Sequence, residues 1–311
     1  MTNGYAASEA RPDYDHRYHA GNVGDVWKHV VWWALLERLQ RNNPALDLVD
    51  CHAGAGEYRL HPTGEWTAGI GALRARGMSA DSAVVAHYRA FIEEFGAHDS
   101  KLRRYPGSPR LLERLRRPSD RVSCYELEPT PFSQLTSAPF DGAIERVHGD
   151  GLAALRARCA EPTSGGLVGL IDPPWNVKAD WRTIPGAVID CLKATPTAVI
   201  AVWYPIKSYT RVNQMIRTIR EAGLPYLVGD LITTPLELQR NRLNGSGIIV
   251  INPPSDLAPT LAAAAAVIGA ACASHHGFFE LRLTASALAA EAAPAALTAG
   301  EHRANGENAI A

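Results

Sequence analysis

The sequence predicts an α/β protein with a mostly parallel, doubly wound sheet, an antiparallel edge strand and a small helical insertion. Two observations support this fold class. Short apolar strands alternate with amphipathic helices along most of the chain. Acidic residues stand at the ends of several of these strands, where ligands bind in such folds. The length of 311 residues suits one such domain with an insertion.

The first elements are a helix and a strand that ends in an acid. "VGDVWKHVVWWALLERLQRN" has helical spacing, with one apolar stripe of Val26, Val30, Trp33 and Leu36. "ALDLVD" reads as a strand that ends in Asp50, and the turn "CHAGAGEY" follows. Residues 60–117 show helical patterns without a convincing strand. We therefore divide the chain into an N-terminal part of the main domain (1–59), a helical insertion (60–117), the rest of the main domain (118–283) and an alanine-rich, disordered tail (284–311).

The alternation resumes after the insertion. Strands are expected in "RVSCYELEP", "AIERVHGDG", "GGLVGLIDPPW" and "TAVIAVWYP", and helices in "LAALRARCA", "DWRTIPGAVIDCLKA" and "SYTRVNQMIRTIREAG". The last two strands, "PYLVGDLITTPLEL" and "GSGIIVINPP", have a glycine-containing loop between them and no helix. They are expected to form an antiparallel pair at the edge of the sheet.

Composition excludes several classes of protein. No run of eighteen apolar residues and no signal-like N-terminus occurs, so we expect a cytoplasmic protein without a membrane partner. Five scattered cysteines argue against a disulfide framework and against a metal site. The net charge of −1 provides no general attraction for nucleic acid. The basic stretch "KLRRYPGSPRLLERLRR" is compatible with a solvated helix face or with a surface that contacts phosphates.

Acids and glycines at strand ends suggest a nucleoside pocket. Gly54 and Gly56 permit a tight turn, but the turn lacks the G-x-G-x-x-G pattern that a dinucleotide would need. Glu126 can accept hydrogen bonds from ribose hydroxyls, and Asp150 from an exocyclic amine. Each residue alone could also be an ordinary surface acid. Together they describe an adenosine pocket without a phosphate cradle.

The sequence "DPPW" (172–175) carries the strongest chemical signal. The Asp172 carboxylate and the Pro173 carbonyl can both accept hydrogen bonds from one amino group, and Trp175 offers a flat face for a planar ring. Acceptors on an aromatic amine favour its reactive form. The structural alternative is a plain strand stop, which is how we interpret "NPPS" (252–255).

These motifs resemble a known family. "YDHRYHAGNVGDVWKH", "DCHAGAGEY", "YPGSP", "ELEP", "LIDPPW", "WYP" and "SGIIVINPP" look like the bacterial methyltransferases that modify N6 of adenine 2030 in 23S rRNA. The resemblance implies a Rossmann-like class I methyltransferase, with S-adenosyl-L-methionine as cofactor and 23S rRNA as partner. It also implies that the adenine is flipped into the "DPPW" pocket. We expect a monomer.

The resemblance also implies roles for individual residues. Asp172 is the expected catalytic residue. The donor-binding residues would be His29, His52, Ser108, Glu126, Asp150 and Gly151. The residues near the substrate would be Tyr14, His16, Lys28 and Trp175, the last of which stands where the family usually has tyrosine. Structural explanations remain for Ser108 as a helix N-cap, His29 as a packed histidine and Lys28 as a surface charge.

Two other functions remain open at this point. A DNA adenine-N6 or protein-glutamine methyltransferase would carry the same four-residue signature. A catalytically silent RNA-binding module on the same fold would bind RNA without the methyl donor.

Overall fold

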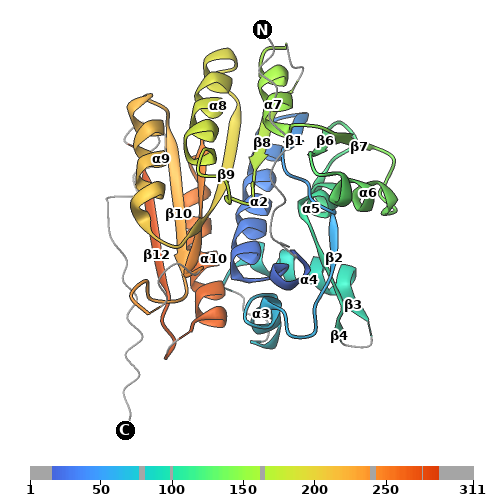
Figure 1. The fold of residues 1–311 in the computed structure, drawn as a ribbon, viewed down its shortest axis with the longest axis vertical. Helices are drawn as coiled ribbons and strands as arrows, with labels where there is room; N and C mark the ends of the chain where they lie inside the picture. Colours follow the sequence, from blue (N-terminus) through green and yellow to red (C-terminus); the bar gives the residue numbers. More distant parts are fainter. Residues whose placement is uncertain are drawn as a thin grey trace.

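The computed structural model describes residues 16–76, 81–98, 101–161, 165–238, 243–274 and 276–286. An eight-stranded sheet forms the centre of the molecule, and helices cover both of its faces (Figure 1). Two short two-stranded sheets lie outside it. The predicted fold class is confirmed.

The parallel part of the sheet contains five strands. In spatial order they are β7 (Ile144–His148), β6 (Arg121–Glu126), β1 (Leu46–Asp50), β8 (Gly166–Ile171) and β9 (Val199–Ile206). β1 and β8, in the middle of this part, are buried almost throughout, as expected for parallel strands covered on both faces. All five carboxyl ends therefore meet at the same edge of the sheet.

Antiparallel strands complete the other side of the sheet. β11 (Gly245–Ile251) pairs with β9 on one side and with β10 (Tyr226–Ile232) on the other. The expected antiparallel pair is therefore present, but β11 lies inside the sheet. The edge strand is β12 (Glu280–Ala285), which pairs with β10. The predicted start of the tail at residue 284 is consequently wrong, and residues 287–311 lie outside the described part of the chain.

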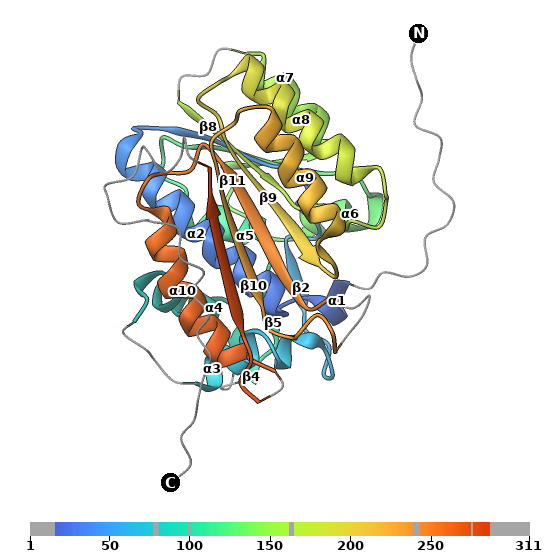
Figure 2. The same cartoon turned by 90° about the vertical axis from the view of Figure 1, so that its left-hand side faces the viewer.

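Each face of the sheet has its own helices, which Figure 2 separates clearly. One face carries α7 (Gly151–Cys159), α8 (Asp180–Ala194) and α9 (Tyr209–Glu221). The other face carries α2 (Val23–Asn42) and α10 (Leu257–Cys272), with α5 (Ser108–Leu115) against β1. The short helices α1 (His16–His19) and α6 (Pro129–Ser137) lie before α2 and after β6 along the chain.

Helix α2 is buried on nearly all sides. The apolar stripe expected from its sequence is buried, and so are most residues on its other sides. The helix packs against β9, β11, α10, α4 (Ala83–Gly96) and α5. The Trp27 indole donates a hydrogen bond to the Gly229 carbonyl at 3.0 Å. Because α2 is enclosed, its polar residues Asp25, Lys28 and His29 are buried too. Buried charges need partners, so these side chains point to a site.

The segment between β1 and α5 forms a small subdomain at the lower right of Figure 1. It contains β2 (Glu57–Arg59), a 3-10 turn (Glu65–Thr67), α3 (Ile70–Ala75), α4 (Ala83–Gly96), β3 (Ala97–His98), β4 (Lys101–Leu102) and β5 (Arg104–Pro106). β2 pairs with β5, and β3 with β4. The expectation of a region without strands is therefore wrong, because these strands have only two or three residues and show no alternating pattern.

Candidate active site

Four acids converge at the carboxyl edge of the parallel strands, as the sequence predicts. Asp50 and Glu126 end β1 and β6, while Asp150 and Asp172 closely follow β7 and β8. The four strands are neighbours in the sheet. Asp50 and Asp172 are close enough for the charge of Asp172 to raise the pKa of Asp50, after the larger effect of burial.

Lys28 links α2 to the predicted catalytic acid. Its Nζ donates to Asp172 Oδ2 at 2.5 Å and to Asp25 Oδ1 at 2.8 Å. The other oxygen of Asp25, Oδ2, accepts from the Gly21 backbone N–H at 2.9 Å. A continuous chain of hydrogen bonds thus joins the start of α2 to Asp172. Asp172 Oδ1 is not engaged by this chain.

The lysine in this arrangement is a buried cation. Its residue is only 6 % exposed, and Asp25 is 7 % exposed. Burial alone would lower the pKa of Lys28, but the two carboxylates overcome this effect and raise it well above its usual value. Lys28 therefore stays protonated at neutral pH. Its ammonium also lies 5.7 Å from the centre of the Trp203 ring.

His52 holds the backbone of Asp172, at the start of the "DPPW" turn. Its Nδ1 accepts a hydrogen bond from the Asp172 backbone N–H at 3.2 Å. Burial lowers the pKa of His52 to about 4, so the imidazole is neutral at pH 7. A neutral ring that accepts at Nδ1 carries its proton on Nε2. His52 therefore orients Asp172 through the backbone.

Trp175 differs from its expected role as an exposed stacking surface. The indole is only 7 % exposed, packs on Trp181 at 4.2 Å between ring centres, and donates to the Trp203 carbonyl at 2.9 Å. Its φ of 54° is unusual for a residue with a side chain. The indole ring anchors this turn to β9 through its hydrogen bond to Trp203. Trp203, next to Asp172 in the strand register and half-buried, is the aromatic residue that sequence reasoning missed.

The glycine turn is fitted closely to Glu126. Gly54 has a φ of 58°, and a Cβ there would come within 2.2 Å of the Tyr58 hydroxyl. The Gly54 N–H donates to Glu126 Oε2 at 2.8 Å, and the Glu128 N–H donates to Oε1 at 2.8 Å. Burial nevertheless raises the pKa of Glu126. The carboxylate is thus fixed, with lone pairs left for a ligand.

Asp150 and Gly151 form the start of α7. Asp150 Oδ1 caps the helix by accepting from the backbone N–H groups of Leu152 and Ala153. The Asp150 side chain is exposed, and its charge acts on His52 across the edge. A Cβ on Gly151 would lie 2.1 Å from the Cys51 carbonyl, so glycine is required for the close approach of α7 to β1.

Ser108 and Asp50 are both buried and are joined by a hydrogen bond. Ser108 is the first residue of α5, after the N-cap Gly107, so the alternative role as N-cap is wrong. Asp50 is completely buried, and burial raises its pKa to about 7. Hydrogen bonds from the Ser108 hydroxyl and the His52 N–H, and the charge of Lys28, lower the pKa only in part.

This shift predicts a measurable pH effect. A carboxyl group with a raised pKa in the folded state costs stability once the pH rises above its unfolded value near 4, and the full cost is reached above about 7. Asp50→Asn lacks this cost. The difference in Tm between the variant and the wild type should therefore shift in favour of the variant by several degrees between pH 5 and pH 8. A difference that does not change with pH would contradict the burial of an ionisable group here.

His29 follows Lys28 on α2, and its ring packs against the insertion. The residue is 1 % exposed, stacks on Tyr105, and shares Nδ1 with the hydroxyls of Tyr88 (3.2 Å) and Tyr105 (3.1 Å). The donor-binding role of His29 stays a prediction.

The structure does not test two of the residues that we predicted to lie near the substrate. Tyr14 lies outside the described residues, and His16 is described only by its place in α1. Asp25 was missed by the sequence analysis. Its spacing of three residues from Lys28 on one helix is the signal that could have identified it.

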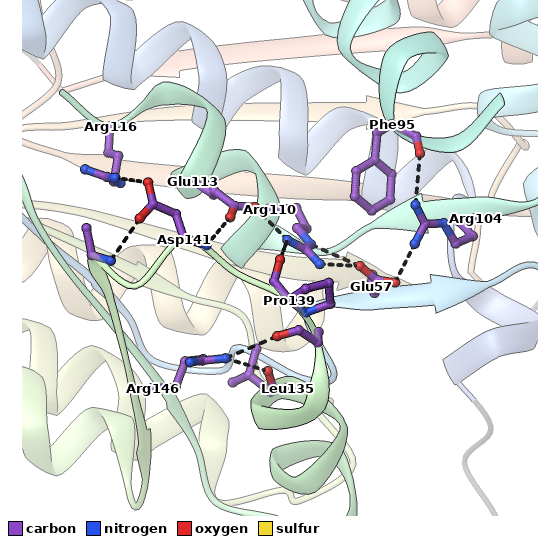
Figure 3. A network of polar contacts seen from close by, with 12 residues as sticks. Glu57, Phe95, Arg104, Arg110, Glu113, Arg116, Leu135, Pro139, Asp141 and Arg146 are labelled. Atoms are coloured by element: carbon purple, nitrogen blue, oxygen red, sulfur yellow. Dashed lines mark hydrogen bonds and ion pairs between the residues drawn. The ribbon is translucent and has the colours of Figure 1, made fainter. Parts of the chain in front are cut away.

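The basic stretch between Lys101 and Arg117 is largely neutralised within the protein (Figure 3). Arg110, only 7 % exposed, pairs with Glu57 at 2.6 Å and with Glu113 at 2.7 Å. The other pairs are Arg104–Glu57, Arg114–Glu94, Arg116–Asp141 and Arg117–Asp120. Neither a solvated helix face nor a phosphate-binding surface describes this cluster. The cluster holds α5 and the residues after it against β2, against α4 and against the turn before β7.

The fold and this edge define a Rossmann-like methyltransferase with an amino-methyltransferase signature. A model of the family "Ribosomal RNA large subunit methyltransferase D, RlmJ" matches residues 43–283. The chain belongs to this family. The prediction of a methyltransferase that uses S-adenosylmethionine is therefore confirmed.

Individual relatives agree with this assignment. The "Ribosomal RNA large subunit methyltransferase J" of Escherichia coli (strain K12) is 32 % identical over 249 residues, covering 78 % of this chain and 87 % of the relative. The protein of the same name from Haemophilus influenzae is 30 % identical over 247 residues, with the same coverage. The crystal structure of protein LPL1258 from Legionella pneumophila has a TM-score of 0.75 and 27 % identity. It covers 86 % of this chain and 99 % of its own.

None of the helices in the described ranges is both long and apolar enough to cross a membrane. Within the same ranges, no three histidine, cysteine or acidic side chains are grouped so that they could hold a metal ion.

Proposed function

We propose that this protein transfers a methyl group to N6 of one adenine in 23S rRNA, of the adenine 2030 type. The observation that carries this proposal is the Lys28–Asp172 pair at the "DPPW" turn. A carboxyl acceptor fixed at a strand end by a lysine, with a proline carbonyl beside it, suits the amino group of a planar base. The two relatives named above are ribosomal RNA methyltransferases, which favours RNA over DNA or protein as the substrate.

The donor fits the residues at this edge. When bound, S-adenosylmethionine supplies an electrophilic methyl group on a sulfonium. Glu126 is held by two backbone N–H groups and keeps acceptor capacity for ribose hydroxyls. Asp150 uses Oδ1 for the cap, which leaves Oδ2 for an amine. His52 accepts from the Asp172 backbone N–H, and Ser108 donates to Asp50.

Asp172 acts mainly as a hydrogen-bond acceptor, because the sulfonium of the donor is already a strong electrophile. Lys28 donates to Oδ2 and leaves Oδ1 for the substrate. Oδ1 and the Pro173 carbonyl can take the two hydrogens of the adenine amino group. When the bond from N6 to the methyl group forms, S-adenosylhomocysteine would leave and one N6 proton would pass to solvent. The hydrogen bonds strengthen as positive charge develops on N6, which is where electrostatic stabilisation lowers the barrier. The adenine must leave its stack to reach them, at a cost of a few kcal/mol.

The test is a methylation assay with labelled donor on three substrates: deproteinised large-subunit rRNA, duplex DNA, and a protein with an accessible glutamine. We expect transfer to rRNA alone, at one adenine identified by mass mapping of nucleoside fragments. Transfer only to DNA or to protein would overturn the proposal. A wild-type protein that binds no S-adenosylmethionine in calorimetry would favour the silent RNA-binding module.

A further inference from the structure

Four exposed cations stand beside Asp172 at the carboxyl edge of the sheet. Lys178 and Arg182 lie in the turn between β8 and α8 and in the first turn of α8. Lys207 and Arg211 occupy the corresponding places between β9 and α9. Since β8 and β9 are parallel neighbours, both turns lie at the same edge. We call these four residues the carboxyl-edge cations.

None of the carboxyl-edge cations has an acidic partner among the described residues. By contrast, five of the seven cations between Lys101 and Arg117 are ion-paired within the protein. The one acid in segments 176–182 and 207–211 is Asp180. A polyanion can therefore bind the carboxyl-edge cations without breaking an existing ion pair.

Their position follows from the strand register. Ile171 of β8 pairs with Val202 of β9, so Asp172 is level with Trp203. β9 continues to Ile206, which puts Lys207 roughly 13 Å beyond that level, at about 3.3 Å per residue. On the other side, the turn from Asp172 leads directly to Lys178. The carboxyl-edge cations thus lie in the two neighbouring turns that follow Asp172 and Trp203 at this edge, and Val177, 42 % exposed, stands next to Lys178.

We propose that the carboxyl-edge cations bind the backbone phosphates of the RNA on either side of the target nucleotide. This inference rests on the proposed function. A flipped base remains attached to its backbone, so the flanking phosphates must lie at the mouth of the pocket that holds the base. Unpaired Lys and Arg side chains at that mouth supply phosphate contacts that position the strand, whereas Asp172 selects the amino group.

The same argument explains how a protein with a net charge of −1 binds RNA. The molecule as a whole does not attract a polyanion, so affinity must come from a local surface. Neutralised phosphates release counterions, and each contact with a single strand contributes about 0.7 to the slope of log K against log salt concentration. Four contacts predict a slope contribution of roughly 3.

The test compares two sets of charge-removing variants. The first is Lys178→Gln/Arg182→Gln/Lys207→Gln/Arg211→Gln. The control is Lys101→Gln/Arg103→Gln, which removes exposed cations on the insertion that likewise lack an ion pair among the described residues. For the first variant we expect the KM for rRNA to rise at least tenfold and the salt slope of RNA binding to fall by about 3. Its affinity for S-adenosylmethionine and its Tm should match the wild type.

The outcomes separate this inference from the proposed function. If the fourfold variant methylates rRNA with the wild-type KM and salt slope, or if the control loses as much, the carboxyl-edge cations are not the phosphate site. If the wild type itself does not methylate rRNA, the proposed function fails instead. Should the fourfold variant fold poorly, the pairs Lys178→Gln/Arg182→Gln and Lys207→Gln/Arg211→Gln each predict about half the loss of slope.

Discussion

Replacing Asp172 by asparagine should reduce methyl transfer to rRNA at least a hundredfold while donor binding is kept. The amide has nearly the same shape, so the turn held by His52 and Trp175 is retained. It lacks the negative charge that the developing positive charge on the amine requires, and it provides only one acceptor oxygen. Losing one such electrostatic contact typically costs about 10²–10³ in kcat. Single-turnover transfer with labelled donor measures the effect.

A matched variant controls for the general loss of a carboxylate. Asp190→Asn, on α8, removes an exposed acid that is paired with Arg156. It should transfer methyl groups at the wild-type rate. Calorimetry should give Asp172→Asn a donor affinity within about threefold of the wild type, because Glu126 and Asp150, the acids that we propose bind the donor, are unchanged. An Asp172→Asn protein with more than a tenth of the wild-type rate would show that this carboxylate is not the essential acceptor.

Replacing Lys28 by methionine should damage both activity and stability. The change leaves Asp25 and Asp172 without the cation that joins them. Removing one partner of a buried ion pair usually costs about 3–5 kcal/mol, because the remaining charge is left without compensation. Asp172 also loses the ammonium that fixes the position of its Oδ2. We expect a loss of transfer of at least a hundredfold and a Tm lower by about 10 °C.

A second substitution separates the two effects. Lys28→Met/Asp25→Asn removes the buried acid that the single change leaves unpaired. The double variant should recover most of the lost Tm but not the lost activity, since Asp172 still lacks its cation. Thermal unfolding and single-turnover transfer measured on the same preparations make the comparison. Recovery of activity together with stability would show that Lys28 serves the fold alone.

Local sequence patterns predicted the parallel strands and the acids that end them. This succeeded because a buried parallel strand is an apolar run, and the residue after it necessarily lies at the ligand-binding edge. The contact between Lys28 and Asp172 could not be predicted in this way. The two residues are 144 positions apart, and only the enclosure of α2 brings them together. The same enclosure explains why the His29 ring is buried against Tyr88 and Tyr105.

The C-terminal part was predicted less well. Helix α10 is rich in alanine and apolar on nearly all sides, so it has no polar face for a helical pattern to detect. Strand β12 is half-exposed and lies directly before the alanine-rich tail, which hid its alternation. The place of β11 between β9 and β10 depends on long-range pairing, which the order of segments along the chain does not reveal.

The enclosure of α2 also has a consequence for biosynthesis. The helix precedes β1 in the chain, yet it packs against β11 and α10, which are synthesised about 200 residues later. At about 5–20 residues per second, roughly 10–50 s separate the synthesis of these segments. During that interval the tryptophans of the early helix lack their final neighbours and are available to chaperones. We therefore expect the nascent chain to gain activity only after β11 and α10 have been made.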